Sequence, residues 1–576
     1  MLIRRTLVAL ALVAAGTSGC QTPAASGIAQ QVASNQPASD AILPPTPFTA
    51  QDFSARLQAL ASDEFGGRAP GSTGETLTLD YLIAQAKELG LQPGNGDSYT
   101  QTVPMVTSLT SPDTTMQLKT PKGSTTLKFP QDMVLGTTTG NPLVQLRNSE
   151  MVFVGYGVNA PELGWNDYEG LDVRGKTVVM LVNDPGFQTG DTSLFEGRRM
   201  TYYGRWTYKF EEAARQGASA ALIVHDNEGA AYGWEVVRNG WTGKQFDLPA
   251  ADDPAPRLPV RGWLTQESAR ALFAAAGLDL AAQYKAASTK GFKPIPLKAT
   301  ATTTLKTTVS QSSSKNFVAK IVGTERPDEA VIYQAHWDHL GTHQGDDAHD
   351  HNTAAPKEDH VWNGAVDNAT GVAGIMTIAQ GFARAGAAPK RSVYFFAPTL
   401  EESGLLGSAY FVAHPSVALN KIAAVINIDA LIPTGKARNL VLIGNGASEL
   451  EDILKPYAAA QGRELAPENT PQDGFYFRSD HFNFAKAGVP ALYIKGGDDL
   501  TEGGLERGRA IQEDYRRNRY HKPTDAFDPS WNLEGVQQDL QALYAVGREV
   551  ANSTTWPRWY PGNAFRKQQD ALRATP

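Results

Sequence analysis

The sequence predicts an α/β protein in which a mixed, mostly parallel sheet is sandwiched by helices and interrupted by a β-rich insertion. In the last half of the chain, an apolar strand, an acidic residue or histidine, and an amphipathic helix follow one another repeatedly. Residues 107–311 depart from this order and contain many short β-like runs. An open α/β sheet places functional groups at the carboxyl ends of its strands. We therefore expect a functional site at these strand ends.

Residues 1–20 have the features of a secretory signal peptide. A pair of arginines precedes an apolar run from Leu7 to Ala15, which is too short to span a bilayer. The stretch TSGC resembles a bacterial lipobox, although Thr17 stands where that box prefers leucine, and we predict lipidation of Cys20. The alternative is ordinary cleavage with Cys20 incidental. We expect export, as a lipoprotein facing the periplasm or else as a periplasmic or secreted protein.

Residues 21–47 are rich in Ala, Ser, Gln and Pro, which predicts a flexible linker. Cys20 is the only cysteine, so the mature chain depends on core burial and not on disulfides. The formal net charge is −8 and no run of Lys or Arg occurs, which argues against a nucleic-acid partner. Membrane contact is expected only through the lipid anchor, and the oligomeric state stays open.

Residues 48–106 are expected to form the first part of the main domain. Thr49 can cap a helix that carries three apolar residues on one face. A second helix is expected from about Thr76 to Leu89, after the glycine-rich turn GGRAPGSTGE. Repeated strand patterns over 107–311 then argue against a long irregular loop, and these residues are assigned to an inserted domain.

The main domain resumes over residues 312–556 with a strand that runs into His336. Period-2 geometry puts the side chains of His336 and Asp338 on the same face of this strand end. Later strand ends and a polar loop supply further candidates, namely Asp367, Glu401, Glu402, Asp429 and His521. The final helix is expected at 532–550, and the tail, 557–576, is expected to be peripheral.

Five blocks in this order, AHWDHLG, GAVDNATG, TLEESGLLGS, NIDA and RYHKPTD, resemble the co-catalytic zinc aminopeptidases related to bacterial leucyl aminopeptidase. Glutamate carboxypeptidase, glutaminyl cyclase and the transferrin receptor ectodomain belong to the same superfamily. The opening SDEFGGRAPGSTGE is similar to that of the family. The stretch DYEGLDVRGKTVVMLVND with KFEEAARQGASAALIVHD resembles a protease-associated domain inserted into such a peptidase.

The resemblance implies a site for two metal ions. His336 and Asp429 would hold one ion, Glu402 and His521 would hold the other, and Asp367 would bridge both. A mixed set of imidazoles and carboxylates suits Zn²⁺, with Mn²⁺ or Co²⁺ as alternatives.

The resemblance also implies hydrolysis of N-terminal residues from peptides. Glu401 would take a proton from water and deliver it to the leaving amine, and Asp338 would orient His336. Asp480 and His481 match a region that borders the substrate pocket in the family, so we expect them to contact substrate or to support the ligands.

Three alternatives stay open. The first is a glutaminyl cyclase. The second is a carboxypeptidase, for which the sequence shows no arginine cluster that would bind a terminal glutamate. The third is a non-catalytic binding protein on this scaffold, which would be expected to have lost ligands that this chain retains.

Overall fold

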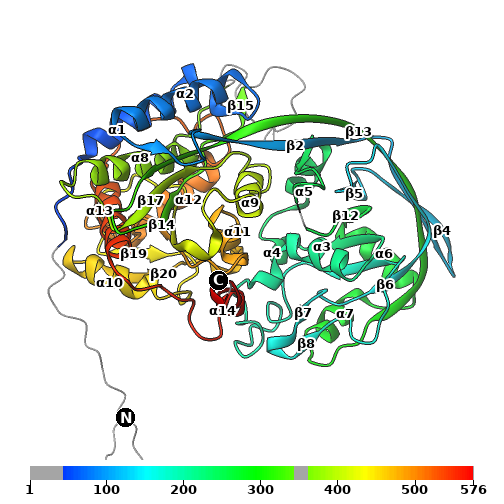
Figure 1. Ribbon diagram of the computed structural model, residues 1–576. Helices are drawn as coiled ribbons and strands as arrows, with labels where there is room; N and C mark the ends of the chain where they lie inside the picture. Colours follow the sequence, from blue (N-terminus) through cyan, green and yellow to red (C-terminus); the bar gives the residue numbers. More distant parts are fainter. Residues whose placement is uncertain (1–42, 254, 343–360, 575–576) are drawn as a thin grey trace, which may run out of the picture. The chain divides into compact units, whose positions relative to one another are not determined.

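The computed structural model describes residues 43–253, 255–342 and 361–574. The predicted signal peptide, Cys20 and most of the predicted linker lie outside these residues. Two sheets, here called the main sheet and the insert sheet, share the long strand β13 (Ile295–Ile321). In Figure 1, β13 and its antiparallel partner β2 (Thr100–Thr110) run from one sheet toward the other. Within the described ranges, no helix has both the length and the apolar character to cross a membrane.

The main sheet has parallel strands at its centre. Strand β14 pairs in parallel with β17 and β18, and β18 pairs in parallel with β21. The spatial order is β13, β17 (Arg391–Ala397), β14 (Arg326–Gln334), β18 (Ile422–Ile428), β21 (Ala491–Lys495), β19 (Asn439–Leu442) and β20 (Glu464–Pro467). The central strands are buried along their length, as expected where helices cover both faces. The predicted mixed, mostly parallel α/β class is confirmed.

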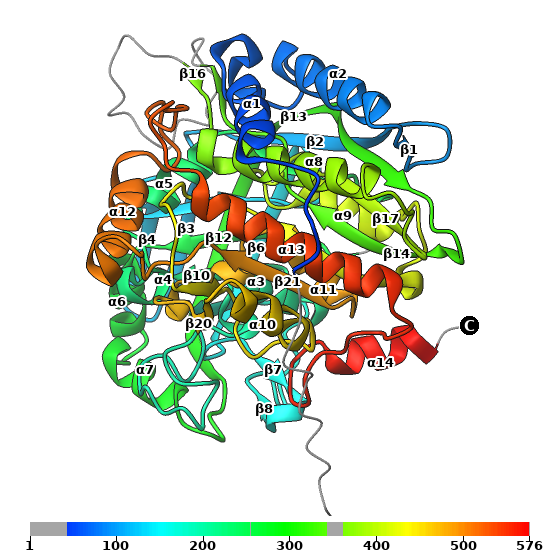
Figure 2. The same cartoon turned by 90° about the vertical axis from the view of Figure 1, so that its left-hand side faces the viewer.

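Alternate residues of β14 face two separate hydrophobic layers. Val331 and Tyr333 pack with α1, α8 and α13, whereas Ala330 and Ile332 pack toward α9, α11 and the segment before α14. Figure 2 shows α13 lying across the first of these faces. The helices of this part are α1 (Ala50–Leu60), α2 (Thr73–Glu88), α8 (Thr370–Ala383), α9 (Leu406–Ala413), α10 (Leu450–Ala460), α11 (His481–Lys486), α12 (Gly504–Asn518), α13 (Glu534–Asn552) and α14 (Arg566–Ala574).

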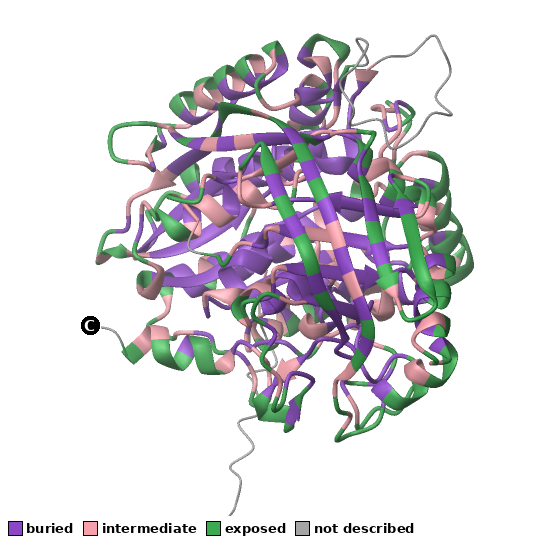
Figure 3. Cartoon of the chain, turned by 90° about the vertical axis from the view of Figure 1, so that its right-hand side faces the viewer, coloured by how far each residue is buried: buried purple, intermediate pink, exposed green. Residues whose placement is uncertain are grey.

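The insert sheet carries its own hydrophobic core. It is built from β4 (Gly123–Lys128), β3 (Thr115–Thr120), β13, β6 (Leu143–Phe153), β9 (Thr177–Leu181), β10 (Ala220–Val224), β12 (Val260–Leu264) and β5 (Met133–Gly136). Figure 3 faces this region and shows long strands banded alternately buried and exposed. Its helices are α3 (Trp206–Arg215), α4 (Asn227–Ala230), α5 (Trp234–Thr242), α6 (Gln266–Ala275) and α7 (Leu280–Ala287).

The remaining strands are short and lie at the margins of the two sheets. Strands β1 (Gln92–Pro93) and β11 (Gln245–Asp247) pair with β13 and β2, and two separate hairpins consist of β7 (Asn159–Ala160) with β8 (Trp165–Asn166) and of β15 (Gly341–Thr342) with β16 (Val361–Trp362).

Several elements differ from their predicted bounds. Thr49 caps α1 through a capping box with Asp52, as its sequence suggests. The second helix begins at Thr73, earlier than predicted. Both predicted ends of the insertion, 106/107 and 311/312, fall inside β2 and β13, because these strands continue without a break from one sheet to the other. The tail, predicted to be peripheral, instead buries Trp559, whose indole N–H donates to the carbonyl of Gly488.

Candidate metal centre

Three neighbouring parallel strands deliver side chains to one edge of the main sheet. His336 follows β14 by two residues, and Asp429 directly follows β18. Glu401 and Glu402 lie in the turn between β17 and α9. The carboxyl ends of adjacent parallel strands meet at this edge, which is why residues far apart in sequence come together here.

Asp367 and His521 reach the same place from loops. Asp367 lies in the irregular turn η4 (Ala365–Ala369) immediately before α8. The carboxylate of Asp525 accepts the N–H groups of Val366 and Asp367, at 3.1 and 3.0 Å. This contact ties the turn that carries Asp367 to the loop that carries His521.

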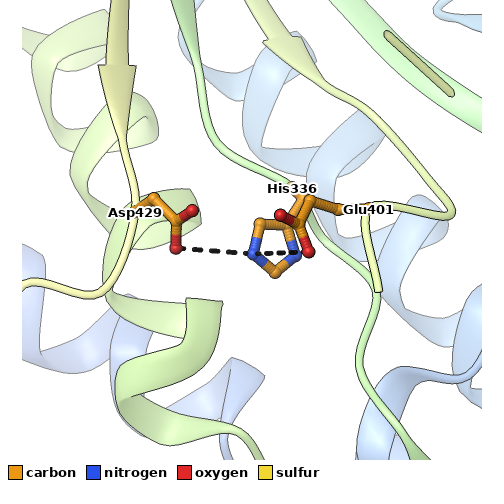
Figure 4. Close-up of side chains that lie close together, drawn as sticks. All are labelled: His336, Glu401 and Asp429. Atoms are coloured by element: carbon orange, nitrogen blue, oxygen red, sulfur yellow. Dashed lines mark ion pairs between the residues drawn. The ribbon is translucent and has the colours of Figure 1, made fainter. Parts of the chain in front are cut away.

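Carboxylates surround the Nε2 atom of His336. Oxygens of Asp367 and Asp429 lie 3.3 and 3.6 Å from it, and an oxygen of Glu401 lies 3.9 Å from it. Figure 4 shows Glu401 and Asp429 flanking the imidazole. The Nδ1 atom of His336 is 3.1 Å from the backbone carbonyl of Asp338, which fixes the orientation of the ring.

A second imidazole occupies the other side of Asp367. Nε2 of His521 lies 3.2 Å from Oδ2 of Asp367 and 3.1 Å from Oε2 of Glu402. Oδ1 of Asp367 faces His336. One carboxylate therefore presents one oxygen to each of two histidines, as the predicted bridging role requires.

The pKa shifts show that the site attracts positive charge. Although burial lowers the pKa of His336, the charges of Glu401, Asp367 and Asp429 raise it well above its ordinary value. Burial also lowers the pKa of His521, but the nearby carboxylates of Glu402 and Asp367 outweigh burial and raise this pKa to about 10. Burial and neighbouring carboxylates raise the pKa of Glu401 well above its ordinary value.

The donor set fits divalent cations. Nε2 of His521 is buried and forms no hydrogen bond with either carboxylate, although both are close. Once it has lost its proton, this nitrogen can bind a cation that lies between the two carboxylates. Two imidazoles with carboxylate oxygens are the ligands that Zn²⁺ prefers. A cation on each side of Asp367 would supply the charge that protonated histidines otherwise provide.

Close grouping of ligand atoms favours slightly different sets from the predicted ones. One group consists of His336, Glu401 and Asp429, whose ligand atoms lie within 4.8 Å of one another. A second group, with the same spacing, consists of His339, Asp367 and Glu402. Nδ1 of His339 lies 2.7 Å from Oε1 of Glu402, so this histidine is a hydrogen-bond partner of that carboxylate. We retain His521 as the candidate ligand because its Nε2 faces both Asp367 and Glu402, and we retain Glu401 as the candidate base.

Asp338 supports both sides of the site. Besides its backbone contact to His336, its Oδ1 accepts the N–H of Glu401 at 3.2 Å. Its carboxylate lies 3.8 Å from Nδ1 of His336, so the shorter orienting contact comes from the backbone carbonyl and not from the predicted carboxylate. Burial raises the pKa of Asp338 to about 7.

Asp480 and His481 lie behind the ligands at the start of α11. Asp480 accepts a hydrogen bond from the hydroxyl of Ser408 at 2.5 Å. The ring of His481 is fully buried near the rings of Tyr476 and Tyr493, and burial lowers its pKa to about 3. His481 is therefore neutral and enclosed by these rings, and its predicted role in contacting substrate or supporting the ligands stays a prediction.

Sequence reasoning missed three residues that hold the site together. His339 stands within the first quoted block, Asp525 within the last, and Arg68 within the glycine-rich turn near the start of the main domain. The sequence motifs singled out residues next to these three, whereas the groups that the three contact lie far away in the chain. Only the folded geometry identifies what they contact.

Residues 316–545 match the model of Peptidase family M28. Leupeptin-inactivating enzyme 1 of Streptomyces exfoliatus is 33% identical over 147 residues, which are 25% of this chain and 32% of that protein. The match thus spans about a third of that relative's length.

Two solved structures align with most of the chain. An aminopeptidase from Aneurinibacillus sp. strain AM-1 is 18% identical and covers 88% of this chain and 95% of its own, with a TM-score of 0.46. BSAP, a zinc aminopeptidase from Bacillus subtilis, is 17% identical and covers 88% and 97%, with a TM-score of 0.40. Both TM-scores lie below 0.5, and neither alignment bears on the chemistry of the site.

Proposed function

Because residues 316–545 form a domain of peptidase family M28, we propose that the chain is an exported metallo-aminopeptidase that releases N-terminal residues from peptides. The observation that carries this proposal is the bridging position of Asp367 between His336 and His521, with Glu401 beside them.

Two Zn²⁺ ions are the proposed cofactor, held by His336 with Asp429, by His521 with Glu402, and by Asp367 in common. When bound, such ions lower the pKa of a water molecule and polarise the scissile carbonyl. The side chains around the ions would carry out the proton transfers.

Glu401 is the proposed general base. Its carboxylate takes the proton from the attacking water and delivers it to the leaving amine. The N–H of Glu401 donates to Asp338, and this contact holds the base in place.

The test compares wild type with Glu401→Gln on a panel of aminoacyl anilides, with metal content measured on both. We expect the variant to lose about 10²–10⁴-fold in turnover while binding the same metal, because a positioned base contributes about that much. The matched control is Glu506→Gln, which changes an exposed glutamate of α12.

Mass analysis of a tetrapeptide digest identifies the end that is cut. Release of the N-terminal residue, abolished by a chelator, supports the proposal. Release of the C-terminal residue, or ring closure of an N-terminal glutamine without cleavage, would replace it with one of the alternative activities. Failure of metal-loaded wild type on every substrate would remove the catalytic proposal.

The lipid anchor at Cys20 belongs to the same proposal. It is supported by the sequence of residues 1–20 alone. Mass analysis of the mature N-terminus, with Cys20→Ala as control, tests it.

A further inference from the structure

His339 contacts two of the loops that carry candidate ligands. Its side chain is fully buried, and its Nδ1 atom lies 2.7 Å from Oε1 of Glu402. The backbone N–H of His339 donates to the carbonyl of Arg68 at 3.2 Å. Its ring lies edge to face with that of His521, with 5.8 Å between the two centroids. The imidazole of His339 is therefore enclosed beside the part of the candidate metal centre that contains His521.

The contact with Glu402 places the ring proton of His339 on Nδ1. An ionised carboxylate only accepts hydrogen bonds, so the nitrogen that faces it must be the donor. Nε2 of His339 is buried and, within the described ranges, has no hydrogen-bond partner. A proton on Nε2 instead would leave a buried N–H without an acceptor and a carboxylate facing a lone pair, which costs stability. His339 therefore donates to Glu402 through Nδ1.

Backbone packing fixes the direction of this donor. Gly364 directly precedes η4, the turn that carries Asp367, and has a φ of +51°. A Cβ atom at this position would lie 2.5 Å from Cδ2 of His339, so the backbone of the turn is in direct contact with the ring. Only glycine leaves room for this contact. The ring of His339 is therefore held in one orientation between the turn and Glu402.

The hydrogen bond gives the two oxygens of Glu402 different partners. Oε1 accepts from Nδ1 of His339, whereas Oε2 lies 3.1 Å from Nε2 of His521. Because the carboxylate is planar and rigid, a fixed donor at Oε1 also fixes the direction of Oε2. His339 thereby keeps one oxygen of Glu402 directed toward His521.

His336 belongs to the other candidate metal position and is oriented independently. Its Nδ1 faces the backbone carbonyl of Asp338 at 3.1 Å, and its ligand atoms group with those of Glu401 and Asp429 (Figure 4). Among the described residues, no hydrogen bond or ion pair joins His339 to His336 or to Asp429. The contact of His339 with its carboxylate partner therefore acts on one of the two candidate positions.

We propose that His339 is a positioning residue that sets the metal affinity of one candidate position, the one between Glu402 and His521. The inference rests on the proposed function, which assigns a divalent ion to each position. Groups that hydrogen-bond to ligating side chains orient them, and their loss typically lowers metal affinity by about 10–100-fold. Without the N–H of His339, the carboxylate of Glu402 can rotate, and its ligand oxygen is no longer held toward His521.

A matched pair of variants separates the hydrogen bond from the space that the ring fills. His339→Asn keeps a side-chain N–H close to the position of Nδ1, whereas His339→Leu is of similar size and has no donor. Metal-free protein is titrated with Zn²⁺ in competition with a chromophoric chelator. We expect two binding steps in wild type. In His339→Leu one step should weaken by about 10–100-fold while the other stays unchanged, and His339→Asn should recover most of the loss.

A purely structural role of His339 predicts a different result. Packing damage would lower the thermal unfolding temperature of both metal-free variants and weaken both binding steps together. Equal weakening of the two steps, or binding by His339→Leu that matches wild type, overturns the positioning role. Failure of His339→Asn to recover the weakened step would make the ring a ligand or a packing group, and also overturns it.

The control variant is His414→Leu. His414 is a half-exposed histidine that lies 3.8 Å from a carboxylate oxygen of Asp252, and its loss should leave both binding steps unchanged. Weakening of one step by this variant as well would show that the effect is not particular to His339, and would overturn the assignment.

Metal binding and peptide hydrolysis are measured separately, so that this inference and the proposed function can fail independently. Selective loss of one step in His339→Leu supports the inference even if wild type hydrolyses no aminoacyl anilide. Hydrolysis by wild type together with unchanged metal binding by His339→Leu overturns the inference and leaves the aminopeptidase proposal standing. Wild type that takes up no divalent ion would overturn both the inference and the proposed metal cofactor.

Discussion

Arg68 joins the first segment of the main domain to both loops that carry the metal centre. It is fully buried and donates to the backbone carbonyls of Leu60, Trp337, Asn363 and Gly364. Trp337 follows His336, a candidate ligand, and Gly364 precedes Asp367, the candidate bridging carboxylate, by three residues. A rigid planar group with five donors satisfies four carbonyls at once, which a lysine cannot do. Arg68 is therefore a positioning residue.

We expect Arg68→Met to lower the free energy of unfolding by at least about 3 kcal/mol, because it leaves buried carbonyl groups without a hydrogen-bond donor. Metal affinity should fall by about 10–100-fold, as for other groups that position ligands. Urea unfolding and metal titration check both values. Arg147→Met, at an exposed arginine, should change stability by less than about 0.5 kcal/mol. Unchanged metal affinity in a folded Arg68→Met protein would contradict the positioning role.

Lys209 is a buried cation within the core of the insert sheet. Burial lowers its pKa to about 7, and burial raises the pKa values of Asp167 and Asp184 to about 7. An aspartate with a raised pKa in the folded state stabilises the protein below about pH 4 and loses this contribution as pH rises through 7. The ammonium of Lys209 offsets that loss by its charge.

Lys209→Met should therefore destabilise the protein increasingly between pH 6 and pH 8, because the charge of Lys209 lowers the pKa values of both aspartates and its loss makes their ionisation in the folded protein less favourable. Thermal unfolding at the two pH values measures the difference from wild type. Lys293→Met, at an exposed lysine that pairs with Glu169, should show no such dependence. A difference that stays constant across this range would refute the role assigned to Lys209.

Helices and strands whose apolar residues recur at a regular spacing could be predicted from the sequence. Features that depend on contacts between residues far apart in the chain could not. The strand before His336 and the strand before Asp429 are apolar runs that end at a polar residue, so their positions follow from the sequence. By contrast, α9 begins only at Leu406, four residues after Glu402, and no periodic pattern marks the irregular turn between them. The four backbone carbonyls that Arg68 satisfies leave no periodic trace in the sequence, because three of them lie about 270 to 300 residues further along the chain.

A buried ion pair joins β20 and α13. Arg463, which directly precedes β20, lies 2.7 Å from Asp539 of α13, and both side chains are almost fully buried. The guanidinium also donates to the carbonyl of Asn439 in the adjacent strand. The pair therefore fixes the edge of the main sheet to the helix that covers it.

We expect Arg463→Met to cost about 3–5 kcal/mol in the free energy of unfolding, because it leaves the carboxylate of Asp539 buried without a partner. The double variant Arg463→Met with Asp539→Leu should recover most of that loss. Urea unfolding of the two single variants and the double variant gives the coupling energy. Additive losses would mean that the two side chains do not depend on each other.

In the whole molecule, the two sheets are expected to unfold together. Strands β2 and β13 pair continuously from Thr110 with Thr307 to Thr100 with Phe317, and β13 also belongs to the insert sheet. Loss of either sheet would therefore expose a strand that the other needs. The described residues, which begin at 43, form one compact unit, in agreement with this coupling.

Ile223→Ala should shift a single calorimetric transition to lower temperature. Ile223 is fully buried in β10, and such a truncation costs about 2–5 kcal/mol. The matched change Val331→Ala in β14 should shift the same transition. A second transition that remains at the wild-type temperature in the Ile223 variant would show that the two sheets unfold independently.

The pairing of β2 with β13 also has an evolutionary consequence. The insertion departs and returns through adjacent strands, so its two ends lie about 5 Å apart, one interstrand spacing. A module with neighbouring ends can be gained, lost or exchanged in one genetic event without moving the strand ends that carry the ligands. Whatever the inserted region contributes could then be inherited separately from the candidate ligands at the strand ends.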